Sequence, residues 1–256
     1  ANEYNNRYTI APVVSYQIND NTKLTFEYTY QRADMSNVGS FYVFSPSGFA
    51  GLPVDFTSLP SGIPGTIIND HSFYANIQHD ISKGWKLTGQ VARFIYSMNG
   101  SSAWPTLVNA DGTMIRNIGV WDAKSNMTMA QVFVNGEIMT GHVRHRILTG
   151  LDLGNKDYIA DWGQSHDLDT VGAEFDPKNP NLGIPVNGYP VFDRTAPLEE
   201  RATKAGGLID QAYSSVYIQD ELGFLNNNIR LTLAGRFTNL DRKSTRLNSS
   251  HANISY

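Results

Sequence analysis

Residues 22–31 read TKLTFEYTYQ, and this stretch decides the fold class. From Leu24 to Tyr30, apolar or aromatic residues alternate with polar ones at a period of two. Successive side chains point to opposite faces in an extended strand, so the pattern predicts a β-strand with one apolar and one polar face. Residues 229–238 (IRLTLAGRFT) repeat the alternation near the other end of the chain. No segment has a convincing helical stripe, and we therefore predict an all-β protein.

The composition excludes several classes of protein. Among the 256 residues, 41% are hydrophobic and 17% are charged, which is not the composition of a disordered chain. No run of about 18 apolar residues could form a spanning helix, but a barrel remains possible because only one face of each strand need be apolar. The net charge of −4 argues against nucleic acid as a partner. Cysteine is absent, which excludes disulfides and thiolate chemistry.

Short and long connections alternate along the chain. We expect eight strands at residues 8–17, 22–33, 70–81, 85–98, 114–138, 142–155, 207–224 and 228–240. Long loops then occupy residues 33–69, 99–113 and 156–206, and the other four connections are short turns. Every second connection of an antiparallel meander lies at the same end, so the long loops should emerge at one rim and the turns at the other. Much of this loop sequence is expected to be mobile until a ligand binds.

This asymmetry is typical of an outer-membrane barrel, which has short turns at one end and long loops at the other. It requires residues 114–138 to form one strand, with no hairpin at Lys124–Asn126, because an extra reversal would exchange the ends of everything that follows. A soluble β-sandwich also gives a period of two. A sandwich seldom carries loops this long on one edge only, and we therefore favour the barrel.

Four short motifs resemble the barrel strands of TonB-dependent siderophore receptors. Residues 216–221 (VYIQDE) and 231–237 (LTLAGRF) resemble a pair of strands in that family, and residues 148–152 (LTGLD) resemble the strand that precedes them. Residues 10–12 (IAP) with 22–25 (TKLT) resemble a hairpin of the same barrel. The motifs occur in the family's order. They lie on strands, so we expect them to shape the barrel rather than to bind a ligand.

The resemblance implies a transmembrane β-barrel of about 22 strands with an N-terminal plug inside it. This chain would be an internal fragment without the plug domain: an antiparallel up-and-down meander of about eight long strands. The implied function is binding and uptake of a ferric siderophore in the outer membrane of a Gram-negative bacterium, without catalysis and without a cofactor. The implied partners are outer-membrane lipid and, through the missing plug, the TonB complex. Eight strands alone leave two open edges, so we expect the fragment not to insert or fold alone.

The last residues of the chain have a different character. Residues 241–251 (DRKSTRLNSSH) can be back-translated into a DNA string that resembles a common short-read sequencing adapter, and the following residues fit its continuation. Scars of this kind are set aside before the fold is considered. We therefore divide the chain into a partial receptor barrel at residues 1–240 and an artefactual, disordered tail at residues 241–256.

Aromatic residues in the long loops are the candidate ligand contacts. The predicted site residues are Tyr42, Phe44, Trp104, Trp162 and Tyr189. Aromatic side chains at a barrel mouth suit a ligand with an apolar or aromatic periphery, such as a ferric catecholate or hydroxamate. The alternative is that they hold the long loops together.

Other candidate chemistry is weak. His142 and His145 lie three residues apart on a predicted strand, so they face opposite sides and cannot share a metal. Five aspartates in the longest loop lack the spacing of a calcium loop and are expected to be solvated; they are Asp157, Asp161, Asp167, Asp169 and Asp176. No catalytic constellation is visible. The alternatives for function are an importer of a vitamin or carbohydrate, an outer-membrane enzyme, and a soluble β-rich adhesin or lectin.

Overall fold

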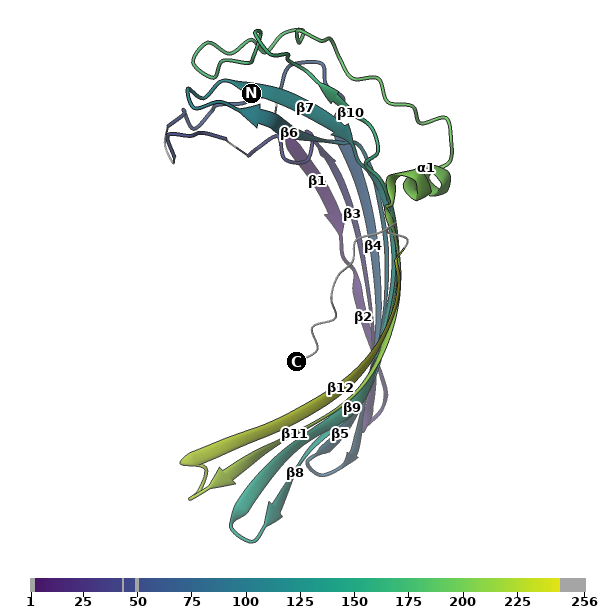
Figure 1. Ribbon diagram of the computed structural model, residues 1–256. Coiled ribbons are helices and arrows are strands. Elements are labelled where there is room, and N and C mark those ends of the chain that lie inside the picture. Colours follow the sequence, from purple (N-terminus) through teal and green to yellow (C-terminus); the bar gives the residue numbers. More distant parts are fainter. Residues whose placement is uncertain (1–2, 43, 49–50, 245–256) are drawn as a thin grey trace.

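The computed structural model describes residues 3–42, 44–48 and 51–244, which form one large curved wall of strands with a smaller sheet and one helix at its rim (Figure 1). The wall consists of β1 (Asn5–Ile10), β2 (Val13–Asn19), β3 (Thr22–Met35), β4 (Thr66–Ser82), β5 (Trp85–Asn99), β8 (Asp122–Thr140), β9 (Val143–Asp161), β11 (Leu208–Phe224) and β12 (Ile229–Ser244). Its order is β1-β3-β4-β5-β8-β9-β11-β12, with β2 also on β3, and all pairs are antiparallel. The predicted all-β, up-and-down meander with eight strand positions is confirmed.

The first strand position is divided, where one strand was expected at residues 8–17. Ala11 and Pro12 separate β1 from β2, and both halves pair with β3. Proline lacks an N–H and is tolerated at the edge of a sheet, where no second neighbour needs that donor. The Pro12 carbonyl still accepts a hydrogen bond from the Tyr28 N–H at 3.1 Å, so the chain keeps its direction across the break.

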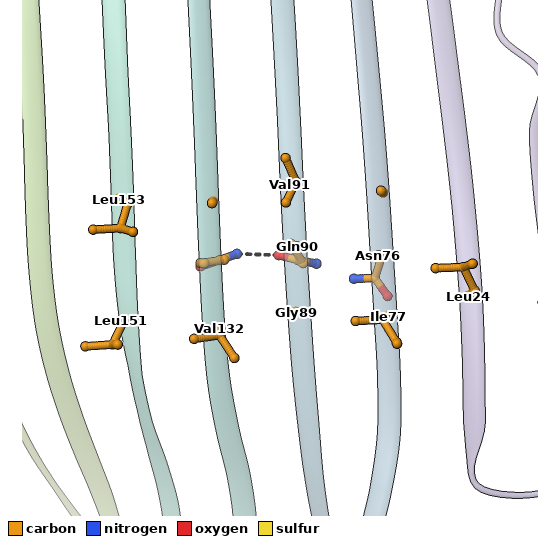
Figure 2. A pocket seen from close by; sticks show the side chains of 12 residues that line it. Leu24, Asn76, Ile77, Gly89, Gln90, Val91, Val132, Leu151 and Leu153 are labelled. Carbon is orange, nitrogen blue, oxygen red and sulfur yellow. Dashed lines mark hydrogen bonds between the residues drawn. The ribbon is translucent and has the colours of Figure 1, made fainter.

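One face of the wall is apolar and the other is polar. A single row across the sheet contains Tyr16, Leu24, Ile77, Gly89, Val132, Leu151, Val216 and Phe237. Figure 2 shows side chains from the middle of this row, among them Leu24, Ile77, Val132 and Leu151. The adjacent row, whose side chains point the other way, contains Thr25, Asn76, Gln90, Gln131, Asp152, Ser215 and Thr238. Most of the apolar side chains are exposed, which marks a surface that something else covers.

The apolar face is the convex one. Helix α1 (Leu198–Ala205) lies on the convex side of the wall in Figure 1. Lys124 of β8 donates a hydrogen bond to Glu199 of this helix at 3.4 Å. By the two-residue period of a strand, Lys124 shares its face with Val132. The polar face therefore lines the concave side.

The apolar area runs obliquely to the rows. On β3 it extends from Leu24 towards the long-loop end of the strand, up to Tyr30. On β12 it extends from Phe237 towards the tight-turn end, down to Leu231. Leu24 and Phe237 belong to the same row, so the apolar area shifts along the strands from one side of the wall to the other. Strands that cross an apolar belt at an angle are the geometry of a transmembrane barrel.

The three long connections emerge at one rim, and the four short turns lie at the other, as predicted (Figure 1). The first connection occupies residues 36–65. The second was expected to be a loop at residues 99–113, but this is wrong: it contains β6 (Ser101–Val108), which forms a hairpin with β7 (Met114–Val120). With β10 (Ser165–Asp167) they form a separate three-stranded sheet in the order β10-β7-β6.

Residues 114–138 keep one direction, as predicted, but they are not one unbroken strand. Lys124–Asn126 pair with both β5 and β9, so there is no hairpin at this position. The interruption is at Trp121, whose N–H donates to the Gly100 carbonyl at 3.0 Å. A side chain on Gly100 would overlap Thr66, so the hairpin can bend here only because this residue has no Cβ. The bend carries β6 and β7 over the mouth of the wall (Figure 1).

The third connection contains the helix that the sequence analysis missed. Its strand β9 continues to Asp161, β10 follows, and α1 precedes β11. The helix has eight residues, which is too short to produce a recognisable apolar stripe. Gly206, at a φ of 69°, ends it in the left-handed conformation that favours glycine. No helix in the described part of the chain is long and apolar enough to cross a membrane.

β12 ends at Ser244, four residues into the segment that was expected to be a disordered tail. Residues 241–244 pair with β11, and the expectation of disorder is wrong for them. The backbone edge of β11 offers N–H and C=O groups that a directly following chain can pair with, whatever its side chains. The remainder of the tail, residues 245–256, lies outside the described residues, and its artefactual origin stays a prediction.

Candidate ligand-binding site

The long connections share a small core of their own above the wall. Leu59 comes from the first connection, Ile118 from β7 and Leu168 from the third connection, and all three are buried against one another. Together the three connections form a single body, here called the rim assembly, which consists of the described residues 36–42, 44–48, 51–65, 101–120 and 162–197.

An ion pair fixes the centre of the rim assembly. Arg116 of β7 donates from Nε and Nη2 to the Asp169 carboxylate, at 2.8 Å each, and both side chains are buried. The Arg116 backbone N–H also donates to Asp169, at 3.0 Å. The guanidinium donates from Nη1 to the Ser58 carbonyl at 2.9 Å and lies 4.1 Å from the centre of the Phe175 ring. One arginine therefore holds all three connections, through a bidentate geometry that is strong when buried.

A second charged cluster ties the end of the third connection to the convex face. Asp122 of β8 accepts hydrogen bonds from Arg194 at 2.9 Å and from Arg201 at 3.0 Å. Arg201 also pairs with Asp161 of β9. Burial lowers the pKa of Arg201, but its hydrogen bonds to Asp161 and Asp122 outweigh burial, and the pKa is raised overall. The Arg201 guanidinium is therefore charged in this cluster.

These pairs correct the expectation that the loop aspartates are solvated. Asp161 and Asp169 are each only 2% exposed, because each is paired with a buried or half-buried arginine. Asp157 and Asp167 are exposed, as expected, and Asp176 is half-buried. In the described residues, no group of three or more acidic or histidine side chains could hold a metal ion.

Three of the five predicted site residues come together. Tyr42 stacks on Trp104 of β6 with ring centroids 5.4 Å apart, and Phe44 meets the same indole edge-on at 6.1 Å. Phe41 extends the group through Tyr42, at 4.7 Å. Tyr42 is 53% exposed and Trp104 is 41% exposed. The group, here called the aromatic cluster, therefore presents ring faces and edges to the outside of the rim assembly.

The position of the aromatic cluster depends on Gly39. This residue has a φ of 85°, which few residues other than glycine adopt. A Cβ at Gly39 would lie 2.8 Å from the Trp104 ring. Beneath the cluster is a cavity of about 20 Å³, which has room for about one water molecule. A ligand as large as a siderophore can therefore contact only the outer surface of the cluster.

The other two predicted site residues lie elsewhere. The Tyr189 hydroxyl donates a hydrogen bond to the Ser61 carbonyl at 2.9 Å, and its ring covers Gly62. Tyr189 therefore fastens the third connection to the first, which is the packing role considered as the alternative. Trp162 follows the end of β9 and is 44% exposed. Among the described residues, neither side chain has a ring contact with the aromatic cluster.

The concave wall below the rim offers a second, polar surface. A hollow of about 560 Å³ is lined by Glu27, Gln90, Gln131 and Asp152, among others. Gln131 donates to Gln90 across β5 and β8, and Figure 2 shows this bond as a dashed line. Asp152 accepts a hydrogen bond from the Tyr213 hydroxyl at 3.0 Å. Its row continues with polar residues on the next two strands, β11 and β12. The alternation of residues in the sequence predicts this polar face but no site residues on it.

The histidines of the GHVRH segment do not form a site. His142 lies in the turn before β9. The His145 ring nitrogen Nδ1 is 2.7 Å from the Asp220 carboxylate on the convex face of β11. The two histidines are thus separate, as predicted.

Comparison with solved structures gives close matches to outer-membrane receptors. No protein-family model and no curated protein matches the sequence. The ferric preacinetobactin receptor BauA of Acinetobacter baumannii matches 95% of this chain with a TM-score of 0.65 and 15% identity. The ferric-catecholate import receptor Fiu of Escherichia coli matches 98% with a TM-score of 0.63 and 12% identity. The pyoverdine receptor FpvA of Pseudomonas aeruginosa matches 96% with a TM-score of 0.60 and 13% identity.

The match covers only part of each receptor. The chain spans 35% of BauA, 40% of Fiu and 34% of FpvA. The matched proteins are transport receptors rather than enzymes. The chain therefore has the β-barrel fold of TonB-dependent siderophore receptors, over about a third of the length of such a receptor.

Proposed function

We propose that the chain is part of an outer-membrane receptor that binds a ferric siderophore and imports it with energy from the TonB complex. The observation that carries the proposal is the exposed aromatic cluster at the rim of a wall that has the fold of siderophore receptors. Tyr42 and Trp104 offer ring faces to a ligand, and the polar concave face lies below them. A large iron chelate with an aromatic or apolar periphery suits contact with the aromatic cluster first and with the polar concave face afterwards.

The distribution of polarity supports a position in the outer membrane. The convex face exposes side chains such as Ile77, Val132 and Leu151, which in water would favour aggregation. The concave face is rich in glutamine, threonine and charged residues, which suits a hydrated lumen. This contrast is the reverse of a soluble β-sandwich, whose apolar faces meet inside.

The binding step is proposed to use contacts without covalent chemistry. Aromatic rings stack on flat catecholate groups or pack against aliphatic arms, and each buried ring contributes about 0.5–1.5 kcal/mol beyond its area. The ferric complex is the transported ligand and not a resident cofactor. Energy coupling through a plug and TonB belongs to the rest of the receptor, and no residue described here is assigned to that step.

Ligand titration of a receptor that carries this chain tests the proposal. Quenching of tryptophan fluorescence by ferric catecholates and ferric hydroxamates gives affinities for the unmodified receptor, for Tyr42→Ala and for Trp104→Ala. We expect tight binding of at least one chelate and a loss of roughly fivefold in each variant, since one ring contact is worth about 1 kcal/mol. Trp162→Ala is the matched control, because it removes an exposed indole outside the cluster, and it should bind normally.

Three outcomes would contradict the proposal. Binding of cobalamin or an oligosaccharide, with no affinity for any ferric chelate, would assign the same barrel to another nutrient. If Tyr42→Ala and Trp104→Ala bind the chelate as tightly as the control Trp162→Ala, the aromatic cluster is not the contact surface. Recovery of the receptor in the soluble fraction of cells would refute a role in the outer membrane.

A further inference from the structure

The aromatic cluster has a carboxylate in the same row of the rim sheet. Trp104 of β6 lies opposite Asn117 of β7, and Asn117 lies opposite Asp167 of β10. Residues directly opposite each other on antiparallel strands point to the same face of a sheet. Two strand spacings, about 10 Å of sheet, separate the indole-bearing residue from the carboxylate-bearing one. The exposed ring and the carboxylate therefore belong to one surface, which a single large chelate can cover.

Hydrogen bonds hold the Asp167 carboxylate in place and leave one of its oxygens free. The Asn117 side chain donates to Oδ1 at 2.8 Å, and the Thr106 hydroxyl donates to the same oxygen at 3.2 Å. Within residues 3–42, 44–48 and 51–244, Oδ2 accepts no hydrogen bond and the carboxylate forms no ion pair. The residue is exposed. Asp167 therefore offers a fixed negative charge and a free acceptor beside the aromatic cluster.

The rest of the rim assembly adds to this negative charge. Its described residues include seven acidic and three basic side chains, a net charge of −4 with histidine neutral. Two of the three bases are already paired: Arg116 with Asp169, and Arg194 with Asp122 of the wall. Lys178 is the remaining base in these described segments. The charge of Asp167 is therefore not compensated by its surroundings.

Charge of this sign distinguishes between the two main kinds of iron chelate. A surface of one charge attracts ligands of the opposite charge and repels ligands of its own. Three hydroxamates carry one negative charge each and neutralise Fe³⁺, whereas three catecholates carry two each and leave the complex strongly anionic. An ammonium or amide N–H in the arm of a hydroxamate chelate can donate to the free oxygen of Asp167, while the aliphatic part of the arm packs on the rings.

We propose that this surface selects neutral or cationic ferric hydroxamates over anionic ferric catecholates, and that Asp167 is the residue of this chain that sets the preference. The inference rests on the proposed function and names the ligand class of the same rim site. The rings supply affinity that does not depend on charge. Asp167 supplies the discrimination, because specificity is a difference between attraction to one ligand and repulsion of another.

The test is a fluorescence titration of a receptor that carries this chain with two chelates of opposite charge. Ferrioxamine B is a cationic ferric hydroxamate, and ferric enterobactin is an anionic ferric catecholate. We expect the unmodified receptor to bind ferrioxamine B more tightly, and added salt to reduce the preference, since exposed charges are screened. Asp167→Asn keeps the shape of the side chain and an oxygen acceptor for Asn117 and Thr106. It should weaken ferrioxamine B by about two- to fivefold and strengthen ferric enterobactin by a similar factor.

Two further variants separate the local charge from folding and from net charge. Asp167→Lys should bind ferric enterobactin more tightly than the unmodified receptor does, and a misfolded rim could not produce such a gain. Asp157→Asn is the matched control, because it removes the same charge from an exposed position on the convex face of β9. Both affinities should stay unchanged in this control.

Three results would overturn the inference. The first is tighter binding of ferric enterobactin than of ferrioxamine B by the unmodified receptor. The second is unchanged affinity for both chelates in Asp167→Asn and Asp167→Lys. The third is an equal change in Asp167→Asn and Asp157→Asn, which would assign the effect to net charge alone.

Failure of this inference is distinguishable from failure of the proposed function. Trp104→Ala is titrated alongside, and it should weaken both chelates by a similar factor, because ring contacts do not depend on the charge of the complex. A receptor that shows this loss but prefers ferric enterobactin contradicts only the selectivity assigned to Asp167. A receptor that binds no ferric chelate contradicts the proposed function as well.

Discussion

Replacing Arg116 with methionine should open the rim assembly while leaving the wall intact. Methionine keeps much of the arginine length but removes every donor. Asp169 then stays 2% exposed with no cation beside it, and the Ser58 carbonyl loses its partner. The perturbation therefore acts on one side chain that contacts all three long connections.

The magnitude follows from the burial of the pair. Breaking a buried ion pair by removing one partner costs about 3–5 kcal/mol, because a charge remains buried without compensation. Both side chains of this pair are buried, at 7% and 2% exposure, so little of that cost is relieved by water. A local destabilisation of this size increases the population of the open rim by roughly 10²- to 10³-fold.

Hydrogen exchange measures this opening directly. Amides of β7 and β10 should exchange roughly 10²- to 10³-fold faster in Arg116→Met than in the unmodified protein. Amides in the middle of β8, around Val132, should keep their rates, because the wall is held by its own ladder. The double variant Arg116→Met with Asp169→Leu should recover most of the protection, since no unpaired charge is left.

Lys204→Met is the control for a surface pair. Lys204 and Glu200 form an exposed ion pair in α1, and such pairs contribute about 0.3–0.5 kcal/mol at most. Rates near the rim should therefore change little. Equal exchange in Arg116→Met and the unmodified protein would refute the reasoning that this ion pair organises the rim. Rapid exchange throughout β7 in the unmodified protein would instead support the expectation that the loops are mobile before ligand binds.

Three further outcomes are expected. Gly100→Val should destabilise the rim hairpin by roughly 1–3 kcal/mol, because the new side chain overlaps Thr66, and limited proteolysis should then cut within residues 101–120; an unchanged digestion pattern would count against the bend. Tyr189→Phe should cost about 1 kcal/mol of rim stability in thermal unfolding while leaving ligand affinity unchanged, since its hydroxyl only bonds Ser61. Residues 1–240 alone should give no protease-resistant insertion into vesicles, because β1 and β12 are unpaired on their outer sides in the described sheet, and stable insertion would contradict this.

The wall could be predicted from the sequence because its signal is local. Residues 22–31 alternate at a period of two, and the side-chain faces follow directly from that period. The position of the loops follows from parity, since each strand reverses the direction of the one before it. The break at Trp121 could not be read in the same way, because it depends on the close approach of Gly100 to Thr66.

The rim assembly could not be predicted from local sequence patterns. Arg116 and Asp169 are 53 residues apart in sequence, and nothing in either segment identifies the other as its partner. One signal was present: Arg116 alternates with the apolar residues Met114 and Ile118 on one face of β7, and a buried arginine requires an acceptor. Loop composition identified Tyr42, Phe44 and Trp104 as candidate contacts because aromatic rings at a barrel mouth suit a ligand with an apolar or aromatic periphery. It could not separate them from Tyr189, whose hydroxyl is used for packing.

The most direct test of the account is the orientation of neighbouring side chains in a receptor that carries this chain. The chain contains no cysteine, so single cysteines can be placed at Gln131 and Val132 of an otherwise cysteine-free receptor and spin-labelled. In lipid vesicles, we expect Val132→Cys to be accessible to oxygen dissolved in the bilayer, and Gln131→Cys to be accessible to a water-soluble nickel complex. Equal access of the nickel complex to both positions, or the reverse pattern, would contradict a lipid-facing convex side and with it the proposed outer-membrane receptor.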